Sequence, residues 1–199
     1  MLVCNLLVAF NLNLYWEYAT PGLRTSPSST GDQVMSPPIE LFRRLTNGVY
    51  IVGVNHGPRS NAFTAAWLTQ VSFDPLLVAL SVNPDNFSYP LLRESGVFTI
   101  NVLRRGDLDL TRHFGTQSGR NADKLAGRRW RSGSLGAPVL EEAIAYLECR
   151  VMGSIPAGDH ELVLGRAVAG AVIDDTAEPM RYAETGDVDG SSELYPASF

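Results

Sequence analysis

The sequence is poor in lysine and in cysteine, and both shortages limit what the protein can do. Lys124 is the only lysine among 199 residues, so basic charge comes almost entirely from arginine, and the net charge is −5. A chain with this net charge is not expected to bind nucleic acid or anionic membranes as its main partner. The two cysteines, Cys4 and Cys149, have neither metal-site spacing nor a partner cluster. We therefore expect a reducing, cytoplasmic setting.

Long apolar segments and the common catalytic motifs are also missing. No GxGxxG, GxxxxGK, GxSxG or HExxH pattern occurs, which removes the usual signatures of Rossmann folds, P-loops, nucleophilic hydrolases and zinc proteases. The apolar run at 1–16 is interrupted by three asparagines, Asn5, Asn11 and Asn13, and lacks a basic leader. It is too short to span a bilayer and does not fit a signal peptide.

The composition changes near residue 35, which predicts a flexible extension at 1–35 and one domain at 36–199. Residues 20–33 are rich in Ser, Thr, Pro and Gly, as in a linker. This composition is explained if residues before Met35 are an upstream extension and the functional protein begins at Met35. A membrane-binding or partner-binding role for the segment is the alternative.

From Ser36 the sequence predicts mostly strands with short helices inserted between them. The expected helices are at 36–48, 89–96 and 106–115, the second with Ser88 as its N-cap, and the expected strands are at 49–55, 60–75, 76–82, 97–103, 143–158 and 161–174. No alternation of strand and helix occurs, so a parallel sheet is not expected. The predicted fold is mainly β, with antiparallel strands in a closed or split barrel.

Four segments, taken in order, carry a resemblance to a known family. They are NAFTAAWLTQVSFDPLLVALSV, SYPLLRESGVFTINVL, GAPVLEEAIAYLECRV and GDHELVLGRAV. Together they resemble the flavin reductase-like family, whose fold is an FMN-binding split β-barrel, over about residues 39–175. The resemblance implies a homodimer that transfers hydride from NADH or NADPH to FMN or FAD, and that supplies reduced flavin to a separate oxygenase.

Two other functions remain open at this point. One is an FMN-binding electron carrier that does not oxidise NAD(P)H efficiently. The other is a barrel relative that uses heme or another cofactor, which the absence of an evident ligand histidine disfavours. The residues that the resemblance assigns to cofactor binding are Asn61, Ala62, Phe63, Thr64, Ala65, Ala66, Trp67, Ser81, Asn83, Ser88, Lys124, Gly158 and Asp159, with His160 as the catalytic residue and no metal ligand.

The strand around Trp67 is the first of three candidate elements. Family members often carry a TAS-S segment here, and this chain matches it at Thr64 and Ala65 but has Ala66 and Trp67 where hydroxyls are common. Hydroxyls and close backbone amides suit a flavin's phosphate and polar edge. A lone tryptophan on a strand more often fills a core than flanks a ligand, so packing is the favoured interpretation of Trp67.

The loop SVNPDNFSYP and the turn GDH are the other two elements. Ser88 and the first amides of the following helix can receive a phosphate, although an ordinary capped helix explains them too. The family's arginine is missing from this loop, which makes Lys124 the expected charged partner. The GDH turn resembles the family's nicotinamide-side signature, with Asp159 orienting His160. A turn in which the aspartate bonds its own backbone is the simpler alternative.

Overall fold

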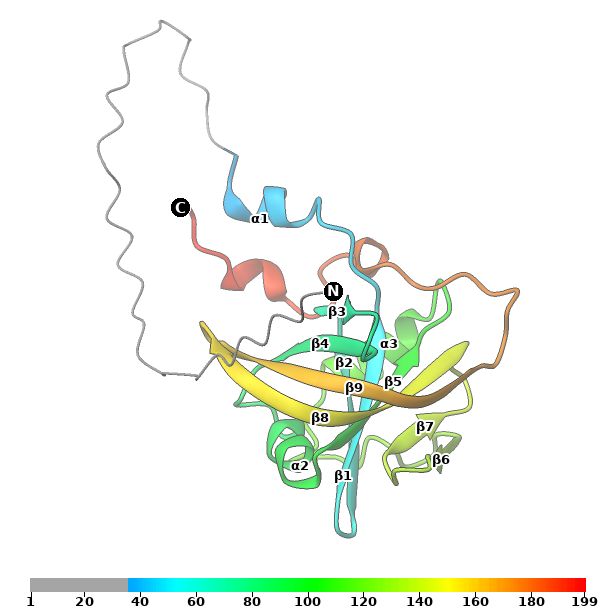
Figure 1. Cartoon of the computed structure of the whole chain (residues 1–199). Coiled ribbons are helices and arrows are strands. Elements are labelled where there is room, and N and C mark those ends of the chain that lie inside the picture. Colours follow the sequence, from blue (N-terminus) through cyan, green and yellow to red (C-terminus); the bar gives the residue numbers. More distant parts are fainter. Residues whose placement is uncertain (1–35) are drawn as a thin grey trace, which may run out of the picture. The chain divides into compact units, whose positions relative to one another are not determined.

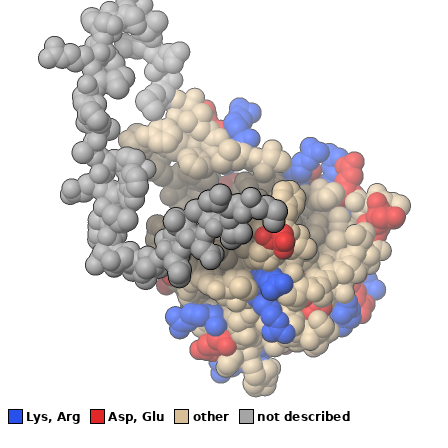
Figure 2. All heavy atoms as spheres, viewed as in Figure 1, with Lys and Arg blue, Asp and Glu red and all other residues tan. Residues whose placement is uncertain are grey.

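The computed structural model describes residues 36–199, so the extension predicted at 1–35 lies outside the described residues. Antiparallel strands dominate this part, as the sequence predicts (Figure 1). On the face that Figure 2 shows, basic and acidic side chains are interspersed. None of the helices in the described part is both long and apolar enough to cross a membrane.

The order of elements agrees closely with the predicted order. Along residues 36–199 the elements are α1 (Pro38–Phe42), β1 (Tyr50–His56), β2 (Arg59–Ala65), β3 (Leu68–Ser72), β4 (Leu77–Val82), α2 (Ser88–Ser95), β5 (Val97–Val102), α3 (Leu108–Gly115), β6 (Trp130–Ser132), β7 (Pro138–Leu140), β8 (Ala145–Ala157), β9 (His160–Val172), and the 3-10 turns η1 (Tyr182–Thr185) and η2 (Ser191–Leu194). The short strands β6 and β7 were not expected from the sequence.

Seven of these strands form one antiparallel sheet in the order β2-β1-β5-β8-β9-β4-β3. The two edge strands, β2 and β3, are neighbours in sequence and are separated only by Ala66 and Trp67. The sheet must therefore curl until its two edges meet at this link. No strand pairing joins β2 to β3 in the described residues, so the sheet is not closed and the barrel is split.

Two local predictions are wrong. Residues 60–75 do not form one strand, because β2 pairs with β1 whereas β3 pairs with β4, on opposite sides of the opening. Ser88 is the first residue of α2 rather than its N-cap, which is Phe87. The hydroxyl of Ser88 instead accepts a hydrogen bond from Asn61 Nδ2 at 2.8 Å. The predicted helix end at Gly96 is confirmed, with φ +65°.

Both faces of the central strands are buried. On β1, Val52 belongs to a core inside the barrel with Phe98 and Ile100, whereas Ile51 belongs to a second core with Phe114 of α3. This division follows from the strand period of two, which sends successive side chains to opposite faces. The barrel interior is thus filled by side chains, and a ligand must bind at its surface or its opening.

Glu148 on β8 is a buried carboxylate that anchors the loop before β7. Its two oxygens accept hydrogen bonds from Ser134 N at 3.0 Å, Ser134 Oγ at 2.9 Å and Leu135 N at 2.9 Å. Burial raises the pKa of the Glu148 carboxyl, but these hydrogen bonds outweigh burial, so its pKa lies below the ordinary value of 4.5. The ionised form therefore stabilises the fold.

We predict that Glu148→Gln lowers the free energy of unfolding by about 1 to 3 kcal/mol at pH 7, because an amide cannot accept all three hydrogen bonds. Since the folded pKa is depressed, the stabilisation is complete above pH 4.5 and is lost as the pH falls through the folded value. Urea unfolding at several pH values measures both effects. Glu141→Gln, at a half-exposed carboxylate 4.0 Å from Arg129, is the matched control. Equal stability of both variants at pH 7 would show that Glu148 is not an anchor.

Candidate functional site

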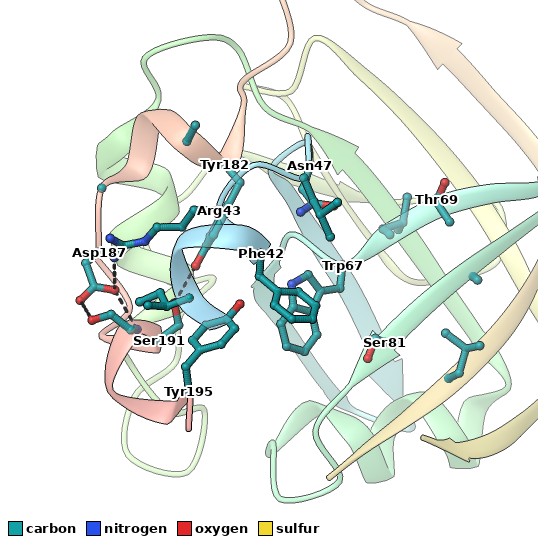
Figure 3. Close-up of a pocket in the computed structure, with 18 residues that line it drawn as sticks. Phe42, Arg43, Asn47, Trp67, Thr69, Ser81, Tyr182, Asp187, Ser191 and Tyr195 are labelled. Carbon is teal, nitrogen blue, oxygen red and sulfur yellow. Dashed lines mark hydrogen bonds and ion pairs between the residues drawn. The ribbon is translucent and has the colours of Figure 1, made fainter. Parts of the chain in front are cut away.

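A cavity of about 820 Å³ lies over the outer surface of β3, β4 and β9 (Figure 3). On β4, Val78, Leu80 and Val82 point into the barrel core, so Ala79 and Ser81 face the cavity. The size and the mixed lining suit a planar organic ligand that carries a few polar groups. The sheet side of the cavity consists of Trp67, Leu68, Thr69, Ala79, Ser81 and Leu162.

The opposite wall is built from α1 and from the chain after β9. The rings of Phe42 and Tyr195 lie 5.8 Å apart between their centroids, and Arg43 lies 4.0 Å from Asp187. Tyr182 Oη forms a hydrogen bond of 2.8 Å with the hydroxyl of Ser191 (Figure 3). Segments from the two ends of the described chain therefore face the sheet across the cavity. No motif in the sequence points to this wall, because isolated aromatic residues carry no recognisable pattern.

Trp67 and His160 meet at the edge of this cavity. Their ring centroids are 4.9 Å apart with an interplanar angle of 51°. Trp67 is 48% exposed and its carbonyl accepts a hydrogen bond from Ser81 N at 2.9 Å. The core-packing interpretation of Trp67 is therefore wrong. The β2–β3 link holds the indole outside the barrel, on the cavity wall.

His160 begins β9 directly after the tight turn that the GDH motif forms. Gly158 occupies this turn with φ +69°, where a side chain would be strained. His160 Nδ1 lies 2.9 Å from Asp159 Oδ1. Because a carboxylate only accepts, Nδ1 carries the proton, and Nε2 stays available for another group. The hydrogen bond to His160 is the main cause that lowers the pKa of Asp159 below 3.8.

A second group of predicted residues lies along β2, toward its N-terminal end. Asn61 is buried and bonds Ser88 of α2. The loop after α3 packs directly on this pair, because a Cβ added at Gly119 would lie 2.7 Å from Asn61 Nδ2 and clash with the Phe87 ring. Thr64 Oγ1 donates to the carbonyl of Thr111 in α3 at 2.9 Å. α3 and the loop after it therefore pack against β2, at Thr64 and at Asn61 respectively.

Lys124 is the most unusual residue of this second group. It is only 3% exposed, and its Nζ donates to the carbonyl oxygen of Phe114 at 2.9 Å. Among residues 36–199 no carboxylate lies within the 4.0 Å of an ion pair from it. Burial lowers the pKa of Lys124 to about 8. A buried cation without a counter-ion is costly, and an anionic ligand would relieve that cost.

The stretch from Asn61 to Trp67 connects the two groups. A small recess of about 170 Å³ lies between them, lined by Thr64, Ala66 and Gly115, and Tyr182 lines both this recess and the larger cavity. Asn61 and Thr64 lie three positions apart on β2, so their side chains point to opposite faces of the strand, and only Thr64 lines the recess. The recess therefore links Thr64, through Tyr182, to the cavity beside Trp67.

The remaining predicted residues lie elsewhere. Ala62, Phe63 and Ala65 pack into the two cores, so only their backbone is free to meet a ligand. Asn83 is exposed, and its Oδ1 accepts a hydrogen bond from Asp85 N at 2.9 Å. Sequence reasoning missed Arg120, which donates to the carbonyl of Asp85 at 3.0 Å and so supplies this loop with an arginine from another segment. Within the described part, no group of His, Cys, Asp and Glu has the arrangement of a metal site.

Comparison with known proteins agrees with this arrangement. The chain is 36% identical over 130 residues to the putative diflavin flavoprotein A 3 of Nostoc sp., a match that covers 65% of this chain and 23% of that protein. This chain thus spans about a quarter of the length of that relative.

Two solved structures share the fold. The NADH:FAD oxidoreductase of Streptomyces globisporus superposes with a TM-score of 0.68 at 28% identity, covering 73% of this chain and 86% of that one. A further structure of that enzyme is a complex with NAD and FAD fragments. An FMN-binding protein from Thermus thermophilus superposes with a TM-score of 0.62 at 30% identity, covering 74% and 81%.

The model of one family matches most of the chain. The match runs over residues 42–190, from the cavity wall at Phe42 to the turn before η2. It therefore includes the Trp67–His160 pair, the Asn61–Ser88 pair and Lys124. This protein belongs to the family of the flavin reductase like domain.

Proposed function

We propose that the protein is an NAD(P)H-dependent flavin reductase that binds FMN or FAD along the path from Lys124 to Trp67. The observation that carries this proposal is that the recess at Thr64 and Gly115 shares Tyr182 with the aromatic-walled cavity, while the buried cation Lys124 bonds the carbonyl of Phe114, beside Gly115. A flavin has the matching form, with an anionic phosphate at one end and a planar ring system at the other. The family and the flavin-binding structural relatives support the same reading.

The phosphate is proposed to lie near Lys124, with Asn61 and Ser88 as neutral partners. Burial lowers the pKa of Lys124 in the folded protein to about 8. Below that pH the buried lysine is charged, and this charge lowers the free energy of unfolding by its full amount. Without ligand, stability therefore rises as the pH increases from about 8 to 10.5, where the unfolded lysine still binds its proton. A bound phosphate would stabilise the charged form of Lys124. Phosphate binding would therefore offset the loss of stability that the buried charge causes.

The ring system is proposed to lie in the cavity beside Trp67. Bound flavin would supply the hydride acceptor for this chemistry. The chain's own contribution is positioning. Trp67 offers a flat apolar surface, and Ser81 offers a hydroxyl on the neighbouring strand of the same wall. His160, held by Asp159 with its Nε2 unused, is proposed to orient the nicotinamide at the cavity edge.

An FMN-binding electron carrier is the second candidate. The diflavin flavoprotein relative favours it, because this chain matches only about a quarter of that larger protein. In such an arrangement the domain would exchange electrons with a neighbouring module. In the first candidate, reduced flavin is proposed to pass to a separate oxygenase.

A homodimer is also proposed. Val71, Phe73 and Leu76 form an apolar group at the β3–β4 turn, and Phe73 is 87% exposed. The group adjoins the open edge of β3, and unpaired edges of this kind are usually covered in stable proteins. A second copy of the chain would cover both features at once.

Purified protein is expected to bind FMN or FAD at micromolar concentration and to oxidise NADH or NADPH in the presence of that flavin. A flavin titration followed by absorbance, and a rate measured at 340 nm with each nucleotide, test this directly. Flavin binding with negligible oxidation of either nucleotide would favour the electron carrier. No binding of either flavin would contradict both candidates.

His160→Ala is expected to lower kcat/KM for NAD(P)H about tenfold to a hundredfold, because one polar contact to the nicotinamide is lost. Flavin affinity should change little. His56→Ala is the matched control, since His56 is half exposed on β1 and lies 3.5 Å from Glu94. If flavin affinity and melting temperature fall together, or if the kinetics are unchanged, His160 is a structural turn residue.

Light scattering is expected to report twice the 21.6 kDa mass of the chain. Phe73→Asp should shift this mass toward the monomer, because a carboxylate cannot be buried without a partner. Leu194→Asp, at another highly exposed apolar residue, should leave it unchanged. A monomeric native protein at working concentration would refute the dimer.

A further inference from the structure

The wall that faces the sheet across the ring-binding cavity is made of two segments that lead away from one point. The first is residues 37–46, which include α1, and the second is residues 186–199, which include η2. The point that they share is a β-bridge between Gly48 and Arg181, and η1 joins the second segment to it. We call the two segments the flaps and the bridge their base.

The base is anchored firmly in the fold. Met180, next to the bridge, is 1% exposed and belongs to the second core. Its N–H donates to the carbonyl oxygen of Leu103 at 2.9 Å, and its own carbonyl accepts a hydrogen bond from Val49 N at 3.1 Å. Tyr182 N donates to the carbonyl oxygen of Asn47 at 2.8 Å. The base is therefore a fixed point from which the flaps can move.

The flaps lack comparable anchors. No residue from Gly186 to Phe199 is buried, and Pro38 is the only buried residue of the first flap. The backbone hydrogen bonds of each flap run between residues of that same flap. Within residues 36–199, no hydrogen bond or ion pair joins either flap to a strand of the sheet. Segments with so few buried contacts open at a small fraction of the free energy that unfolds the core.

The second flap is folded on itself and is tethered to η1. Asp187 Oδ1 accepts a hydrogen bond from Ser192 N at 3.0 Å. The hydroxyl of Tyr182 donates to Asp189 Oδ2 at 3.0 Å and lies 2.8 Å from the hydroxyl of Ser191. This flap is therefore expected to move as one piece, with Tyr182 as its pivot.

Two contacts join the flaps to each other in the described part of the chain (Figure 3). The rings of Phe42 and Tyr195 are tilted by 44°, with their centroids 5.8 Å apart. Arg43 lies 4.0 Å from Asp187, and these two side chains are 55% and 38% exposed. An exposed ion pair contributes little to stability, and one ring pair contributes modestly. The flaps can therefore part without breaking a buried hydrogen bond.

We propose that the flaps part to admit the flavin ring, close over it, and so keep the flavin bound between turnovers. This inference rests on the proposed function, because it places the ring beside Trp67. A ring in this position contacts Trp67 and the aromatic residues Phe42 and Tyr195 together only when the flaps are closed, so the ligand shifts them toward the closed state. Release then requires opening, and opening rather than hydride transfer limits the delivery of reduced flavin to another protein.

The test joins the flaps covalently and measures the rate of flavin release from the full chain. Phe42→Cys combined with Tyr195→Cys places one thiol on each flap where the two rings meet. A short bifunctional thiol reagent with a cleavable disulfide then connects the flaps. We expect flavin loaded beforehand to dissociate about tenfold or more slowly after cross-linking, because the open state is no longer populated. Reduction of the reagent should restore the original rate, which dilution followed by flavin fluorescence measures.

Leu41→Cys combined with Arg44→Cys is the matched control, because both positions are exposed on the first flap and neither lines the cavity. The reagent attaches there without joining the flaps, so the rate of release should stay unchanged. Both variants also carry Cys4→Ser, and Cys149 is buried. Melting temperatures show whether the variants fold.

Release that slows when the flaps are joined and recovers on reduction supports the inference. It does so even if neither nucleotide is oxidised, an outcome that would defeat the proposed reductase alone. Flavin that leaves at the same rate before and after cross-linking would overturn the inference while the proposed function stands. A native protein that binds no flavin would overturn both.

Discussion

The link of two residues between β2 and β3 constrains the rest of the structure. These strands are the two edges of a seven-stranded sheet, so the sheet has to curl until Ala66 and Trp67 can bridge them. The link cannot take part in a regular ladder, and Trp67 is therefore directed outward rather than into the barrel. The same bend places the indole beside His160, although 93 positions separate the two residues in the sequence.

Two buried ionisable groups show how the fold treats charge. Glu148 is satisfied from within, by three hydrogen bonds that lower its pKa. Lys124 is equally buried but has one carbonyl partner, and burial lowers its pKa to about 8. The protein alone supplies all the hydrogen bonds that stabilise the charge of Glu148. The charge of Lys124 would be stabilised further by a bound anion. This difference separates a structural anchor from a proposed ligand-binding residue.

The sequence predicted most of the element order because alternating strands and short capped helices are local patterns. It did not predict the break at Ala66, since the hydrophobic pattern runs through it and only the change of partner strand reveals it. The position of Ser88 depends on its hydrogen bond with Asn61, and the position of Trp67 depends on the curl of the sheet. Both involve residues that are far apart in the sequence. Arg120, Phe42 and Tyr195 could not be found in this way, because tertiary packing alone brings them to the site.

The central claim is that one flavin reaches from Lys124 to Trp67 past the recess at Thr64. A crystal structure of the protein with FMN bound tests it most directly. The account predicts the phosphate within hydrogen-bond distance of Lys124 Nζ, and the ring system against Trp67 on the wall that Ser81 shares. A flavin bound elsewhere, or one whose phosphate points away from Lys124, would contradict the account.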